Sequence, residues 1–225
     1  MKKRQLLLTE DGSHTLFIPE LNETYHSTHG AIQESNHVFI KEGLKYYLSD
    51  KSVDELWIFE VGFGTGLNAL LTAIFAEQNN TNIIYDAIEA FPLEATELKD
   101  LNYTYQIKSQ SAAIIFSKMH TTKWNELMPI SNNFKIKKIH RQIQDYHLSG
   151  RYDICYFDAF APSKQPEMWE KSTLEKIYHS LKTDGIFVTY SAQGQLKRNL
   201  KAIGFEVHTI EGPPGKYEMV RGIKT

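Results

Sequence analysis

The sequence predicts an α/β protein built on a seven-stranded, mostly parallel sheet with helices on both faces. From residue 51 onward, short apolar runs of strand length alternate with helix-like segments, giving five successive βα repeats. A glycine-rich turn joins the first apolar run to its helix. The last two runs, at 205–210 and 217–223, read as an antiparallel hairpin.

The elements of the main domain can be placed in order. A buried strand ends at Glu60 and Val61, and its helix runs over 67–76. Residues 93–128 read as helical, whereas 134–139 alternate apolar and polar side chains like a strand with one solvent-exposed face. The other expected strands lie at 82–89, 152–158 and 186–190, and the other expected helices at 172–181 and 195–202.

The first fifty residues precede the βα repeats. Residues 4–18 read as a hairpin, and the later part of 23–48 has the apolar spacing of helices that pack over the main domain. We therefore expect two parts. An extension over 1–50 covers the cleft, and a main domain occupies 51–225.

Composition excludes several classes of protein. A chain of 225 residues with 41% hydrophobic residues can bury a sizeable core, and no apolar stretch approaches a membrane span. The run at 6–8 is too short for a signal-peptide core. Cys155 is the only cysteine, so Cys-based zinc sites are excluded, and no His pair suggests another metal site. We expect a cytoplasmic monomer without a metal and without a membrane partner.

The formal net charge of −2 gives no strongly basic field over the whole chain. Binding to a nucleic acid would therefore depend on a local patch. The best candidate is a basic cluster at one strand, and a plain solvated strand face is the equal alternative. The cluster consists of Lys135, Lys137, Lys138, His140 and Arg141.

The glycine-rich turn has the pattern acidic-x-G-x-G-x-G, from Glu60 to Gly66. Glycines let the backbone turn tightly and approach a ligand, and the helix behind offers free N–H groups. A dinucleotide fingerprint would need a small residue where Leu67 stands. The pattern instead resembles the first motif of S-adenosylmethionine (SAM)-dependent methyltransferases, although a turn without a cofactor remains an alternative. The expected cofactor-binding residues here are Glu60, Gly62, Phe63, Gly64, Thr65, Gly66 and Asn68.

Sheets of this kind bind ligands at the carboxyl ends of their strands. Glu89 ends the second strand at the usual distance from the glycine turn for a carboxylate that binds ribose hydroxyls. A solvated acid at a strand end is the alternative. Gln142 follows the strand at 134–139, where the adenine contact could run through its side chain or the backbone.

Asp158 ends a central strand and enters a loop with two prolines and two large aromatic residues. Such a loop can exclude water, and the Asp158 carboxylate could orient and deprotonate a nucleophile that faces the methyl donor. Amino methyltransferases often carry a polar residue before a proline-aromatic loop at this place. A purely structural loop capped by Asp158 is the alternative.

These motifs together resemble one family, the methyltransferases that complete 5-methylaminomethyl-(2-thio)uridine at the tRNA wobble position. The fold of that family is the Rossmann-like class I methyltransferase fold. The chain resembles the methyltransferase domain of MnmC in its stand-alone MnmD type, since 225 residues leave no room for a fused FAD-dependent oxidase. The matching residues are Tyr25, His26, Ser27, Gly30, Ala31, Glu34, Ser35, Val38 and Phe39, the turn at 60–68, the loop at 157–169 and the tail at 212–216.

The resemblance implies methyl transfer from SAM to the amine of 5-aminomethyluridine at position 34 of tRNA. Glu89 would hold the ribose, Asp158 would lie at the amine, and Glu34 would line the same cleft. The tail departs from the family at Tyr217, where an arginine is usual. Two other functions stay open, an N-methyltransferase of a small-molecule amine and a non-catalytic nucleotide-fold binding protein.

Overall fold

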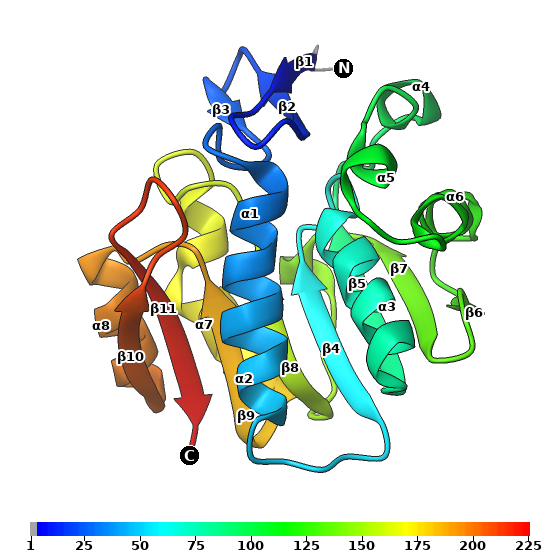
Figure 1. Ribbon diagram of the computed structural model, residues 1–225. Coiled ribbons are helices and arrows are strands. Elements are labelled where there is room, and N and C mark those ends of the chain that lie inside the picture. Colours follow the sequence, from blue (N-terminus) through cyan, green and yellow to red (C-terminus); the bar gives the residue numbers. More distant parts are fainter. Residues whose placement is uncertain (1–3) are drawn as a thin grey trace.

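The computed structural model describes residues 4–225. Residues 1–3, which belong to the expected extension over 1–50, lie outside the described residues. The main body has three layers, with a sheet between two sets of helices (Figure 1). The expected α/β architecture is confirmed.

The chain begins with a small separate sheet. β1 (Gln5–Leu8) pairs antiparallel with β2 (His14–Ile18), which confirms the predicted hairpin. A third short strand, β3 (Glu23–Thr24), pairs with β2 and was not predicted. The small sheet lies at the end of the molecule toward which the arrow of β4 points (Figure 1).

One long helix follows and lies along a face of the main sheet (Figure 1). It consists of α1 (Ala31–Ser35), the π-helical segment η1 (Asn36–Lys45) and α2 (Tyr46–Leu48). η1 contacts α3 and strands β8, β9 and β11. The buried side chains Val38, Phe39 and Leu44 fix the helix to the sheet, so its N-terminal turn is held rigidly beside the strand ends.

The main sheet has the strand order β10-β11-β9-β8-β4-β5-β7-β6. The five strands from β9 to β7 in this order run parallel, and β11 runs antiparallel beside β9 and β10. The strands are β4 (Leu56–Val61), β5 (Ile83–Glu89), β6 (Leu127–Pro129), β7 (Phe134–His140), β8 (Tyr152–Phe157), β9 (Leu181–Thr189), β10 (Phe205–Glu211) and β11 (Glu218–Lys224).

The sheet therefore has eight strands, and the expectation of seven was wrong. The additional strand β6 pairs antiparallel with β7 at the edge of the sheet. Its sequence was assigned to the end of a helical stretch, because three residues are too few to show strand alternation. Pro129 fits this position, since an edge strand tolerates a missing N–H donor.

The stretch 93–128 is not one helix but three short ones, α4 (Ala95–Leu98), α5 (Tyr103–Gln106) and α6 (Ala112–Thr121). The Asn102 side chain lies at the break between α4 and α5. Its Nδ2 donates to Gly12 O at 2.8 Å, and its Oδ1 accepts from His14 N at 2.8 Å. These bonds tie the segment to the N-terminal sheet, a tertiary interaction that helical periodicity does not reveal.

Two hydrophobic cores fill the space on either side of the sheet. The side chains of β4 alternate between them: Leu56 and Ile58 enter the core beneath the long helix and α3 (Leu67–Asn79), and Phe59 and Val61 enter the other. The second core is covered by α7 (Lys171–Ser180) and α8 (Gly194–Ile203). Because both faces are buried, the central strands read as nearly continuous apolar runs in the sequence.

The remaining elements are two short 3₁₀ turns, η2 (Ile143–Asp145) and η3 (Pro166–Trp169). β10 and β11 form the predicted closing hairpin. Cys155 is a buried strand residue, as expected, and burial raises the pKa of its thiol. No helix within residues 4–225 is both long and apolar enough to cross a membrane.

Candidate active site

The strand order reverses between β4 and β8, and this reversal opens a crevice at the carboxyl ends of the two strands. Val61 is paired with Phe157, and Asp158 N donates to Val61 O at 2.9 Å. Gly62 and Asp158 therefore leave the sheet side by side. A cavity of about 1210 Å³ lies at this place.

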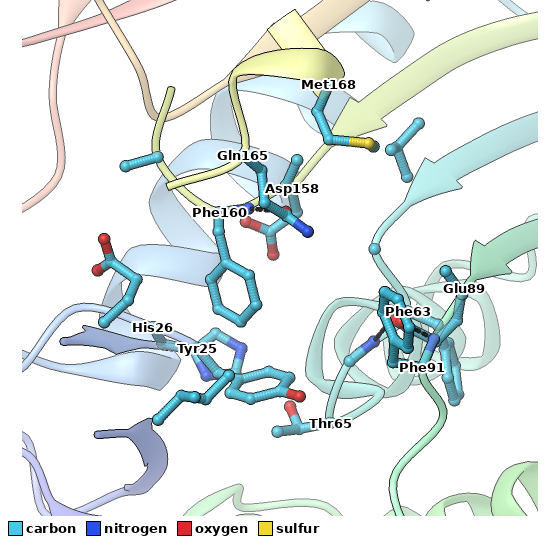
Figure 2. A pocket seen from close by; sticks show the side chains of 18 of the residues that line it. Tyr25, His26, Phe63, Thr65, Glu89, Phe91, Asp158, Phe160, Gln165 and Met168 are labelled. Atoms are coloured by element: carbon cyan, nitrogen blue, oxygen red, sulfur yellow. Dashed lines mark hydrogen bonds between the residues drawn. The ribbon is translucent and has the colours of Figure 1, made fainter. Parts of the chain in front are cut away.

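Segments far apart in the sequence line the cavity. They come from the N-terminal sheet and α1, the glycine turn, the end of β5, the segment after β7, the Asp158 loop and the tail. Figure 2 shows Phe160 pointing toward Tyr25, with Phe63, Glu89 and Phe91 on the opposite side. The lining residues include Tyr25, His26, Glu34, Gly62, Phe63, Gly64, Thr65, Asn68, Glu89, Phe91, Gln142, Asp158, Phe160, Tyr190 and Lys216.

Gly62 brings the glycine turn into contact with the Asp158 loop. Its φ of 89° lies in the left-handed region, and a Cβ built there would be 2.4 Å from Asp158 O. Only a residue without a side chain allows the two backbones to approach this closely. The turn and the loop are consequently fixed relative to each other.

The back of the turn packs against α6. Gly66 has a φ of 75° and precedes α3, and a Cβ there would be 2.9 Å from His120 Nε2. The same nitrogen lies 3.1 Å from Thr65 O, and burial lowers the pKa of His120 to about 4, so the ring is neutral at pH 7. Gly66 does not line the cavity and acts by shaping the turn.

Glu89 joins the turn to the next strand end. One carboxylate oxygen accepts from Gly64 N at 3.0 Å and the other from Phe91 N at 2.8 Å. These bonds fix the carboxylate at the cavity wall, and each oxygen keeps a further lone pair. Glu89 can therefore accept hydrogen bonds from ligand hydroxyl groups without releasing the turn.

Asn68 connects the glycine turn with Asp158. Its Nδ2 donates to Asp158 Oδ2 at 2.8 Å and to Glu60 Oε1 at 3.0 Å. Glu60 is fully buried and does not line the cavity, so it acts on the site through Asn68. Within residues 4–225, the buried atoms Asn68 Oδ1 and Glu60 Oε2 have no hydrogen-bond partner.

Both carboxyl groups beside Asn68 have raised pKa values. Burial, followed by the negative charge of Glu34, raises the pKa of Asp158 to about 7, against the opposing effects of Asn68 and Lys216. Burial also raises the pKa of Glu60 well above its usual range. A carboxyl group that titrates near neutral pH is suited to exchange a proton during catalysis.

The loop after Asp158 is held by its own side chains. Trp169 Nε1 donates to Phe160 O at 2.8 Å, and the backbone N of Phe160 donates to Gln165 Oε1 at 3.2 Å. The rings of Phe160 and Tyr25 meet edge to face with centroids 5.1 Å apart. This contact joins the loop to the N-terminal segment across the cavity.

Except for Glu60 and Gly66, every residue named from the sequence as cofactor-binding or catalytic lines the cavity. Glu34 lies in an ion pair with Lys216 on the Asp158 side. Gln142 is exposed at the rim.

Several cavity residues were not assigned a role from the sequence. Lys216 and Tyr25 belonged to the matched motifs, which was the available signal, whereas Tyr190 and Phe91 carried none. His26 also belonged to the matched motifs; it is buried and lies at the cavity, where burial lowers its pKa to about 4.

The basic cluster proposed for phosphate binding is not one surface. Lys138 is buried, its Nζ donates to His120 O at 3.1 Å, and it lies 4.9 Å from the centroid of the Trp124 ring. Lys135 lies near the amino end of β7, opposite to the end that carries Arg141. Among residues 4–225, no group of three His, Cys, Asp or Glu side chains is arranged to hold a metal ion.

A family model described as S-adenosyl-L-methionine-dependent methyltransferase matches residues 107–225. Two curated relatives are called tRNA 5-methylaminomethyl-2-thiouridine biosynthesis bifunctional protein MnmC. The one from Pseudoalteromonas atlantica is 30% identical over 99% of this chain, and the one from Leptospira interrogans is 28% identical over 96%. The chain covers 34% and 35% of their lengths, about a third of each.

Solved structures show the same fold. MNMC2 from Aquifex aeolicus superposes with a TM-score of 0.80 at 23% identity, covering 99% of this chain and 70% of that one. DesVI from Streptomyces venezuelae reaches a TM-score of 0.52 at 9% identity, covering 86% and 92% of the two chains. At these identities, the likeness concerns the fold.

Proposed function

The chain belongs to the S-adenosyl-L-methionine-dependent methyltransferase family, and from this premise we propose that it methylates the amine of 5-aminomethyl-(2-thio)uridine at tRNA position 34. The product would be 5-methylaminomethyl-(2-thio)uridine. The names of the curated relatives support tRNA as the substrate. We further propose that it acts as a cytoplasmic monomer without a metal, and that the extension over 1–50 covers the cleft.

One observation carries this proposal. Asn68, in the first turn of α3 directly after the glycine turn, donates a hydrogen bond to Asp158, so the proposed methyl-donor site and the proposed proton acceptor share one cavity. The close approach of Gly62 to the Asp158 loop keeps this spacing constant. A methyltransferase needs this alignment of two reactants.

The residues at one end of the cavity fit SAM. The buried Asn68 Oδ1 has no partner within the described chain and would accept a hydrogen bond from the α-ammonium group. The Glu89 carboxylate would accept from the ribose hydroxyls, and Gln142, which also lines the cavity, would contact the adenine. The backbone from Gly62 to Thr65 would pass along the methionine part.

When bound, SAM supplies an electrophilic methyl group on a sulfonium. In the proposed transfer, the amine nitrogen would form a bond to this carbon as the carbon–sulfur bond breaks. The Asp158 carboxylate accepts a proton from the nitrogen, so that its lone pair is free to attack. The loop from Asp158 to Trp169 excludes water and orients the nitrogen.

The charge of the cavity wall favours a cationic acceptor. Acidic side chains outnumber cationic ones, and an aminomethyl group is a cation before it loses its proton. Field lines concentrated in such a crevice raise the local concentration of a positively charged group. The acidic lining residues are Glu20, Glu23, Glu34, Glu89, Glu94, Asp158 and Glu167, and the cationic ones are Arg4, Arg141 and Lys216.

The acceptor can be tested with methyl-labelled SAM and three mixtures. The first contains tRNA from cells that lack this gene, the second contains free 5-aminomethyluridine nucleoside, and the third contains no acceptor. We expect label in the tRNA and little in the free nucleoside. Efficient labelling of the nucleoside alone would support a small-molecule methyltransferase, and SAM binding without labelling of either would support a binding protein.

A further inference from the structure

Lys216 and Glu34 form an ion pair at the Asp158 end of the cavity. Lys216 lies in the loop between β10 and β11, and its Nζ is 2.5 Å from Glu34 Oε1. The same ammonium group lies 3.9 Å from the centroid of the Tyr190 ring. The other oxygen of Glu34 accepts from Ser27 N at 2.7 Å, so the pair is held from both sides.

The pair is connected to Asp158 through the cavity wall. Tyr190, beneath the Lys216 ammonium, donates its hydroxyl proton to Ala159 O at 2.8 Å, and Ala159 follows Asp158. The charges of the pair act in opposite directions. The carboxylate of Glu34 raises the pKa of Asp158, and the ammonium of Lys216 lowers it.

Other titratable side chains face Asp158 or the pair, but burial favours their uncharged forms. Burial raises the pKa values of Glu60 and of three tyrosines, and it lowers the pKa of His26. Among the described residues, Glu34 and Lys216 thus remain as the charges that act on Asp158 near pH 7. The uncharged groups are Glu60, Tyr85, Tyr103, Tyr190 and His26.

We infer that Lys216 is a positioning residue, which neutralises Glu34 against the Tyr190 ring and thereby sets the ionisation of Asp158. The inference deepens the proposed function and rests on it for the role of Asp158 as the base. Without Lys216, an uncompensated Glu34 would keep Asp158 protonated at neutral pH. Without Glu34, an uncompensated Lys216 would make Asp158 a weaker base.

The test follows the carboxyl carbon of Asp158 by NMR in the full-length protein labelled with ¹³C-aspartate. The resonance is assigned with Asp158→Asn, and no substrate is needed. We expect Lys216→Met to raise the titration midpoint and Glu34→Gln to lower it, each by roughly half to one pH unit. The double variant should titrate near the wild type, and Lys216→Arg should restore the wild-type midpoint.

Lys123→Met and Glu126→Gln are matched controls, because they break an exposed ion pair, 3.6 Å apart, outside the cavity wall. Neither control should move the midpoint. If the ion pair only held the structure together, Lys216→Met and Glu34→Gln would leave the titration midpoint unchanged or shift it in the same direction. Either result would overturn the inference. Opposite shifts without tRNA methylation would support the inference and reject the proposed substrate.

Discussion

At the scale of single residues, Asp158 is the proposed proton acceptor. Asp158→Asn keeps the shape of the side chain but removes the proton acceptor. We expect methyl transfer to fall by roughly 10²–10⁴-fold, the usual contribution of a general base, with the affinity for SAM changed little. Single-turnover kinetics and calorimetry measure the two quantities.

Asp100→Asn is the control for this substitution, since Asp100 is exposed and does not line the cavity. It should leave both quantities unchanged. Wild-type turnover in Asp158→Asn would remove Asp158 from the mechanism.

The same residue also affects stability. The pKa of Asp158 is about 7 in the folded protein, above that of an unfolded aspartate, so its contribution is fully present at low pH and is lost as the pH rises through 7. Asp158→Asn lacks this loss. We expect the variant to gain on the order of 4 kcal/mol in unfolding free energy relative to the wild type between pH 4 and pH 8.

Urea denaturation at the two pH values measures this gain. An equal difference between variant and wild type at both pH values would mean that Asp158 titrates in its ordinary range. Such a stability cost at an active site is common, because functional groups are placed where folding alone would not favour them.

Glu89 is expected to act on binding instead of turnover. Glu89→Gln weakens an acceptor of hydrogen bonds from Gly64 N and from the proposed ribose hydroxyls. We expect the dissociation constant for SAM to rise roughly 10–100-fold. Calorimetry with SAM measures it, and Glu206→Gln, at an exposed glutamate, is the control. An unchanged affinity would contradict the ribose assignment.

At the scale of elements, the contact between the glycine turn and the Asp158 loop fixes the geometry of the site. Gly62→Ala would place a Cβ 2.4 Å from Asp158 O at a positive φ. We expect a loss of roughly 2–3 kcal/mol in unfolding free energy and a loss of SAM binding, because turn and loop must separate.

Gly194→Ala is the matched control. This glycine begins α8, and a Cβ there would meet only the mobile end of the Arg198 side chain, at 3.3 Å. It should be neutral or slightly stabilising. If Gly62→Ala were equally harmless, the close approach of the two backbones would be unimportant.

The elements also show where sequence reasoning succeeds. The parallel strands were found because their buried runs are long and their ends carry glycine or an acid, as at Glu60 and Asp158. β6 and the break at Asn102 were missed, because both depend on contacts with distant segments. The sequence pattern indicated that Lys138 lies on a solvent-exposed strand face, but the end of α6 and Trp124 cover it.

At the scale of the whole molecule, the fold brings together groups whose sequence separation hides their relation. The carboxyl ends of parallel strands share one edge, so Glu89 and Asp158 could be assigned to one site from the sequence. The ion pair of Glu34 and Lys216 joins residues 182 positions apart, and no local sequence pattern indicates it. Motif reasoning thus placed the glycine turn, Glu89 and Asp158 at one cavity, but it did not reveal the pairing of Glu34 with Lys216.

The central claim is methyl transfer to the amine of the wobble aminomethyluridine. The most direct measurement incubates the protein with trideuteromethyl-labelled SAM and tRNA from cells that lack this gene, and then analyses the nucleosides by tandem mass spectrometry. The account predicts the heavy methyl group on the nitrogen of the 5-aminomethyl substituent at position 34. A heavy methyl group on a ring atom, a ribose or another position, or on no nucleoside at all, would contradict it.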